Sequence, residues 1–193
     1  MTVVVHKPFT PIQQMHEALR IWEFAAQILE AVKTGSLVPY SLPTLFKLRM
    51  EFVELPFEVR FTRREYGRVS RHNFYASTGL CALVFDEAMN VTFGRKTKEF
   101  PTEHTGLTAA RAIVFQVRNA FAHGPSQPKW AIRNANYKRK YRIDELMIEA
   151  DLATLDGQDF SMRHIGGWIR YKALLTYCLE RVEDKQRGMD RGT

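Results

Sequence analysis

The chain has 193 residues, 45% of them hydrophobic, which is enough to bury one core without help from disulfides or cofactors. Its 28 Lys and Arg against 21 Asp and Glu give a formal net charge of +7, which favours an anionic partner but says nothing about fold. The N-terminal residues lack the pattern of a signal peptide, and no segment approaches the roughly 18 consecutive apolar residues of a membrane span. We therefore expect one soluble cytoplasmic domain with no membrane partner. Cys81 and Cys178 lie far apart within apolar helical patterns and are expected to be buried thiols.

The first half of the chain carries two segments with helical periodicity. The first, residues 11 to 33, has Trp22 in its apolar stripe and is followed by the stop signal Gly35. Three prolines then mark an irregular connection, in which the stretch LFKLRMEFVEL is expected to form a short helix. The second helix is expected over residues 64 to 90, with Gly79 as a mild cost in helix propensity. Residues 95 to 105 are polar and contain Pro101, which predicts a loop.

The second half carries two more predicted helices with a change of period between them. The third helix covers residues 107 to 123 and ends at Gly124 and Pro125. Alternation and a turn signal at Asp156-Gly157 predict a β-hairpin or small meander between about residues 129 and 160. A last helix is expected over 165 to 183, before a polar, frayed tail at 184 to 193. The fold class is thus mainly α, a four- to five-helix bundle with a small β insertion before the last helix.

The start of the insertion is strongly basic. Residues 129 to 142 hold six Lys or Arg and no acid, interleaved with aromatic residues. Such a run can hold a phosphate backbone and stack bases, or it can be the solvated face of a hairpin. On the first interpretation the RNA-binding residues are Trp130, Lys138, Arg139 and Lys140.

The end of the third helix, VRNAFAHG, contains three polar residues, Arg118, Asn119 and His123, that can form one site. The core stripe of this helix is Leu107, Ala110, Val114, Val117 and Phe121, and beside it runs a second strip of Arg111, Phe115, Arg118 and Ala122. Asn119 and His123 are four residues apart and therefore stack on one face. The long side chain of Arg118 can bend toward the helix end, so the three polar groups can converge if something packs over the second strip.

These residue types suit the cleavage of a phosphodiester without a metal ion. Histidine titrates near neutrality, so His123 can take a proton from a ribose 2′-hydroxyl or give one to the leaving oxygen. The guanidinium of Arg118 can bind the phosphate oxygens on which charge develops, and Asn119 can orient the imidazole or the phosphate. Arg111 is a weaker candidate for contact with the substrate.

The arrangement R-N-x-x-x-H at the end of a late helix resembles the ribonuclease-type members of the HEPN (higher eukaryotes and prokaryotes nucleotide-binding) superfamily. Arg118, Asn119 and His123 match that pattern. The resemblance implies a helical domain that dimerises about this helix and forms a composite site from two copies of the motif. It further implies a metal-independent endoribonuclease for single-stranded RNA or tRNA, with no cofactor, acting as a toxin or phage-defence effector with a cognate antitoxin protein. The predicted strands depart from a plain bundle.

Two other interpretations of the motif remain open. The motif can be a helix terminator only, since a cation in the last turn followed by Gly and Pro is what capping selects. The domain can also be a HEPN-like module that binds nucleotides or proteins without catalysis. His72 and His164 fit ordinary surface or entry positions of helices, and no carboxylate pair has the spacing of a metal site.

Overall fold

The computed structural model describes residues 9–37, 45–50, 53–58, 62–94, 106–122, 124 and 126–190. Within them the chain is mainly helical: α1 (Pro11–Thr34), α2 (Arg63–Phe93), α3 (Gly106–Ala122) and α4 (Trp168–Asp190) account for most of the structure. Two small antiparallel sheets accompany the helices, β1 (Leu45–Met50) with β2 (Val53–Glu58) and β3 (Lys140–Ile143) with β4 (Ile148–Asp151). The predicted mainly helical class with a small β insertion is confirmed.

Local signals in the sequence set the ends of the first two helices. The hydroxyl of Thr10 accepts a hydrogen bond from the Gln13 backbone N–H, and the Gln13 side chain accepts one from the Thr10 N–H. Thr62 and Glu65 repeat this reciprocal capping box at the start of α2. Gly35 closes α1 at φ 77°, a left-handed conformation that glycine adopts without steric cost.

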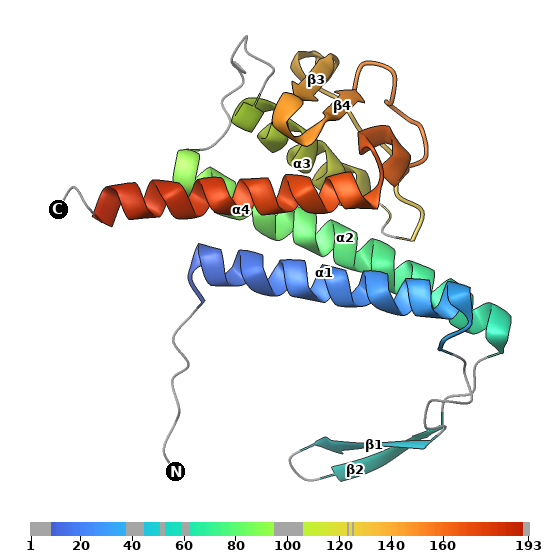
Figure 1. The fold of residues 1–193 in the computed structure, drawn as a ribbon. Coiled ribbons are helices and arrows are strands. Elements are labelled where there is room, and N and C mark those ends of the chain that lie inside the picture. The colour runs from blue at the N-terminus through green and yellow to red at the C-terminus, as the bar shows by residue number, and fades with distance from the viewer. Residues whose placement is uncertain are drawn as a thin grey trace.

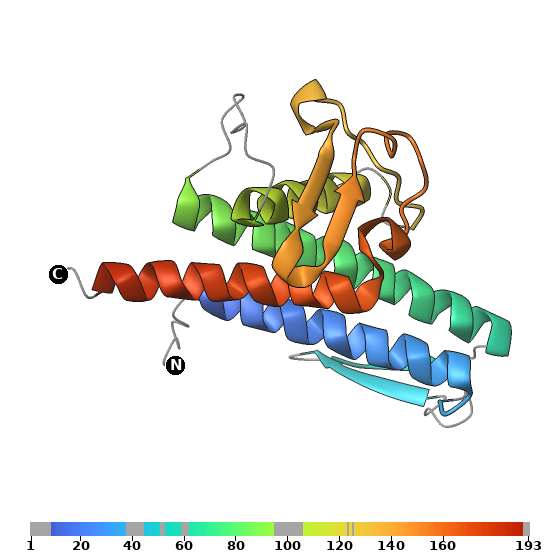
Figure 2. The same ribbon diagram turned by 45° about the horizontal axis from the view of Figure 1, so that its top comes forward.

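The helix α2 lies at the centre of the fold and contacts the other three helices. Figures 1 and 2 show α1, α2 and α4 running side by side, with α3 and the β3–β4 insertion on one side of them. The indole N–H of Trp22 on α1 donates to the Thr78 hydroxyl on α2 at 3.0 Å, and its ring meets Tyr171 of α4 edge to face at 5.5 Å between centroids. These contacts join three helices in one buried core.

The insertion between α3 and α4 has its own apolar layer, which continues the helical core. Its largest buried side chains are Trp130, Ile132, Tyr141, Ile143, Ile148 and Leu152. The ring of Phe160 links the two parts, since it lies 4.9 Å from Phe121 of α3 and 5.1 Å from Trp130. The insertion therefore covers one side of α3.

Three boundaries differ from those the sequence predicts. The short helix expected in LFKLRMEFVEL is wrong, because this stretch belongs to the hairpin β1–β2, with Leu48 paired to Leu55; Figure 1 shows the hairpin apart from the helices. A 3-10 helix, Met162–Ile165, precedes α4, and two glycines with positive φ, Gly166 and Gly167, separate it from the start at Trp168. At its other end α4 extends to Asp190, so most of the predicted frayed tail is helical. The loop predicted over 95 to 105 lies outside the described residues.

Candidate functional site

The end of α3 carries the polar residues that the sequence singles out. On the predicted core stripe Ala110, Val114 and Val117 are fully buried, and Phe121 is 5% exposed. Arg118 and Asn119 lie on the last turns of the helix and are half-buried, while Ala122 is exposed. His123 lies outside the described residues, so the structure places two of the three motif residues.

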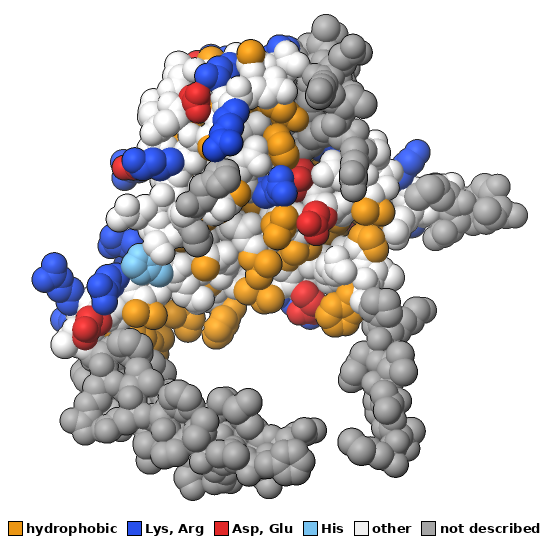
Figure 3. Space-filling model, turned by 180° about the vertical axis from the view of Figure 1, so that it is seen from behind, with side chains coloured by type: hydrophobic (Ala, Val, Ile, Leu, Met, Phe, Trp, Pro, Cys, Tyr) orange, Lys and Arg blue, Asp and Glu red, His pale blue; other side chains and the backbone are white. Residues whose placement is uncertain are grey.

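Arg118 lines an apolar groove between α3 and α2. The groove has a volume of about 360 Å³ and is lined by Ala76, Gly79, Leu80, Leu83, Arg118, Phe121 and Ala122. The guanidinium carbon of Arg118 is 5.9 Å from the centroid of the Phe115 ring, within reach of a cation–π interaction. Leu80 is 47% exposed although it is apolar. Figure 3 shows hydrophobic side chains gathered across the middle of the face turned away from the viewer in Figure 1.

Gly79 explains how closely α2 and α3 approach at this groove. A Cβ atom at this position would lie 2.8 Å from the Cβ of Phe121, closer than such atoms approach one another. The absence of a side chain thus lets the end of α3 settle directly on the backbone of α2. From the sequence alone, Gly79 is expected only to lower the helix propensity of α2.

Asn119 contacts its own helix. Its side-chain amide donates to the Oε1 atom of Gln116 at 3.5 Å, and Gln116 is 2% exposed. This long hydrogen bond restrains the amide near the helix end. An orienting role toward an imidazole or a phosphate remains a prediction.

Arg111 is engaged within the fold. Its Nη2 atom donates to the backbone carbonyl of Gly94 at 2.6 Å and lies 3.4 Å from the Oδ1 atom of Asn90. Burial lowers the pKa of its guanidinium, and the carboxylate of Asp86 acts in the opposite direction. Because the guanidinium holds the carboxyl end of α2, its contacts are those of a structural residue.

The second strip on α3 is partly covered by the chain itself. The Phe115 ring packs on Tyr137 of the insertion at 5.2 Å, and Arg111 binds the end of α2. The insertion therefore supplies part of the neighbour that this strip requires. The strip stays open only toward its end, at Arg118 and Ala122.

The basic run at the start of the insertion is balanced by acids that follow it. Lys138 binds Asp156 at 2.7 Å, Lys140 binds Glu149 at 2.7 Å, and these hydrogen bonds lower the pKa of both carboxyls. Residues 129 to 160 contain six Lys and Arg and six Asp and Glu, so the insertion has no net charge. The structure thus favours the solvated-face interpretation for Lys138 and Lys140. Arg139 is half-buried between them.

Trp130 is 1% exposed and belongs to the core of the insertion. Its indole N–H donates to the Nδ1 atom of His164 at 2.8 Å. The predicted stacking of this ring on a base does not fit its burial, since the ring is enclosed in the core of the insertion and packs on Phe160. Burial lowers the pKa of His164. The sequence gives no sign of this pair, because its partners are far apart along the chain.

Comparisons with known proteins add no relative: no family model matches the chain, and neither the curated proteins nor the solved structures contain a significant match. None of the described helices combines the length and apolar character that a membrane crossing requires. Among the same residues, no three His, Cys, Asp or Glu side chains gather as metal ligands would.

Proposed function

We propose that the protein is a metal-independent endoribonuclease that cuts single-stranded RNA or tRNA at a composite site in a homodimer. The observation that carries the proposal is the position of Arg118 and Asn119 on the last turns of α3, where Arg118 lines an open apolar groove. The resemblance of Arg118, Asn119 and His123 to the HEPN ribonuclease motif supports the same conclusion.

The chemistry needs one base, one acid and one cation. His123 of one copy takes the proton of the ribose 2′-hydroxyl as its oxygen forms a bond to phosphorus, and His123 of the second copy protonates the 5′-oxygen as the bond from that oxygen to phosphorus breaks. The products are a 2′,3′-cyclic phosphate and a 5′-hydroxyl. Arg118 binds the non-bridging oxygens while charge develops on them.

The groove supports a dimer about α3. An exposed leucine beside small apolar side chains offers a surface that two copies can bury against each other about a twofold axis. Leu80→Glu should then give a monomer with little nuclease activity, as measured by sedimentation velocity and RNA cleavage. The matched variant Ile169→Glu changes a residue on α4 that is 73% exposed, and should leave both properties unchanged.

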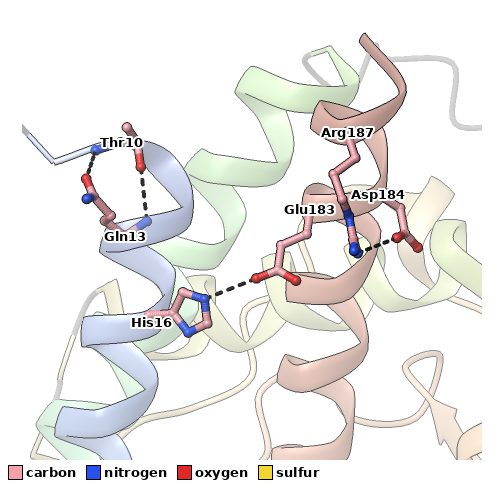
Figure 4. Close-up of polar contacts among 6 residues, drawn as sticks. All are labelled: Thr10, Gln13, His16, Glu183, Asp184 and Arg187. Carbon is pink, nitrogen blue, oxygen red and sulfur yellow. Dashed lines mark hydrogen bonds and ion pairs between the residues drawn. The ribbon is translucent and has the colours of Figure 1, made fainter. Parts of the chain in front are cut away.

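The decisive experiment measures cleavage of a fluorescent single-stranded RNA in EDTA. His123→Ala and Arg118→Ala should each reduce the rate at least a hundredfold, since positioned acid–base groups contribute about that much or more. His16→Ala is the matched histidine control. As Figure 4 shows, His16 lies on α1, where it contacts Glu183 of α4 at 3.1 Å. Full activity of His123→Ala would refute the site.

The alternative is a module on the same fold that binds nucleotides or a protein without catalysis. The apolar lining of the groove favours this candidate, since such a lining also suits a protein partner, including an antitoxin. RNA binding without cleavage in EDTA or Mg²⁺ would support it. Toxicity on overexpression that Arg118→Ala abolishes would support the ribonuclease and a role as a toxin or defence effector.

A further inference from the structure

The first turns of α2 carry a local excess of positive charge. Residues 63 to 85 contain four arginines, and Glu65 is the only acid among them. The carboxylate of Glu65 accepts hydrogen bonds from the backbone N–H and the hydroxyl of Thr62, so it is engaged in the capping box. Arg64, Arg68 and Arg71 are exposed, and among the described residues none of the three forms an ion pair. Figure 3 shows Lys and Arg side chains gathered with a histidine at the end of the molecule where α2 begins.

These three arginines share one face of α2. Their spacing of four and three residues places them in a single row, which we call the arginine row. Like charges at such spacing destabilise a helix, so the row does not stabilise α2. Arg63 stands outside it, because its guanidinium lies near Gly35 at the end of α1.

The arginine row leads toward the end of α3. The next residues on the same face of α2 are Tyr75 and Gly79, and both meet Phe121: the Tyr75 ring lies 6.2 Å from the Phe121 ring, and Gly79 packs on its Cβ. At the opposite end of α3, Arg111 contacts Gly94, so the two helices run antiparallel. The C-terminal end of α3 therefore points toward the end of α2 that carries the arginine row. Helical rise puts Arg64 roughly 16 Å beyond Tyr75 along the axis.

We propose that the arginine row binds the phosphate backbone of a single-stranded RNA and leads that strand to the end of α3. Guanidinium groups in one row match a polyanion, and neutralised phosphates release counterions. The balanced insertion offers no comparable excess of charge, so the row is a better candidate for RNA contact than the insertion. This inference rests on the proposed ribonuclease function and names the path of its substrate.

The test measures binding separately from cleavage. A fluorescent oligouridylate of 20 nucleotides is titrated with the cleavage-deficient His123→Ala protein at several salt concentrations. In that background, Arg64→Gln/Arg68→Gln/Arg71→Gln should weaken binding about a hundredfold at 0.1 M salt, because three phosphate contacts on a single strand each contribute about 0.7 to the salt slope. The slope itself should fall by about 2.

The control triple Arg20→Gln/Lys185→Gln/Arg187→Gln removes the same charge from α1 and from the end of α4, which lies opposite the start of α2 in Figure 1. It should change affinity less than threefold. Equal losses of affinity from the two triples would overturn the inference, because RNA binding would then depend only on the net charge of the protein. Cleavage by the wild type together with unchanged binding by the arginine triple would overturn it while the ribonuclease stands.

Two further outcomes separate the proposals. Arginine-dependent binding of the oligonucleotide without cleavage in the wild type would retain the row as an RNA site and remove the catalytic function. Binding to vesicles of phosphatidylcholine and phosphatidylserine, but not to RNA, would overturn the RNA assignment in favour of a membrane surface. Circular dichroism of each triple should show the helix content of the wild type, as expected if no helix is lost.

Discussion

The hydrogen bond between Trp130 and His164 should make the stability of the insertion depend on pH. His164 can accept the indole proton only while its Nδ1 atom is unprotonated, and Trp130 is 1% exposed. Protonation turns Nδ1 into a donor and leaves the buried indole N–H without an acceptor. An orphaned buried donor costs about 1–3 kcal/mol, which sets the scale of the effect.

The direction follows from the pKa of His164. Folding lowers this pKa below its ordinary value of 6.5, chiefly through burial, so the unfolded chain takes up the proton first as pH falls. The stabilisation from the neutral histidine is complete above pH 6.5 and is lost as pH falls through the lower folded value. We expect the free energy of unfolding to fall by up to about 2 kcal/mol between pH 7.5 and 5, because one histidine contributes at most about 1.4 kcal/mol for each pH unit below its unfolded pKa.

Urea unfolding followed by circular dichroism measures this loss in the wild type and in Trp130→Phe. The variant loses some stability at pH 7.5 because a smaller ring leaves a gap. It lacks the donor and should show a flatter pH dependence, while the burial of His164 retains the rest of the slope. Trp168→Phe, in which a tryptophan that is 44% exposed is changed, should keep the wild-type slope. An unchanged slope in Trp130→Phe would show that the hydrogen bond does not couple protonation to folding.

Two further substitutions test how α2 and α3 are joined. Gly79→Ala should reduce the free energy of unfolding by up to about 2 kcal/mol, because overpacking against Phe121 outweighs the gain in helix propensity. Gly67→Ala, where nothing lies within 4 Å of the added Cβ, should instead stabilise α2 by about 0.5–1 kcal/mol in the same urea experiment. Arg111→Met should cost about 1.5–3 kcal/mol by removing the charged hydrogen bond to Gly94, whereas Arg20→Met, an exposed residue paired with Glu17, should change stability by less than about 0.5 kcal/mol. Equal effects within either pair would contradict the contacts described above.

Periodicity in the sequence was sufficient for most of the helices. The stripes containing Trp22 and Val117 mark faces that are buried in the structure, and Gly35 marks the end of α1. The hairpin β1–β2 was missed although LFKLRM alternates apolar and basic residues from Phe46 onward, a period of two that indicates a strand. The prolines in and around it, Pro39, Pro43 and Pro56, favour irregular structure instead.

The candidate site was predictable only where it depends on local geometry. The helical wheel placed Arg118 at the edge of the core, and the structure confirms that position. The tasks of Arg111 and Trp130 depend on partners distant in sequence, Gly94 and His164, which no local pattern reveals. For the same reason the basic run was interpreted without the acids that neutralise it.

The electrical neutrality of the insertion has a consequence for how the molecule meets its partners. With that module balanced, Arg64, Arg68 and Arg71 leave a local excess of cations at the start of α2, which gives this end of the described structure a positive potential. A distant polyanion is attracted to such an end before contact, so productive encounters become more frequent than random collision allows. Added salt screens this electrostatic steering, so it should lower the association rate constant more than it raises the dissociation rate constant.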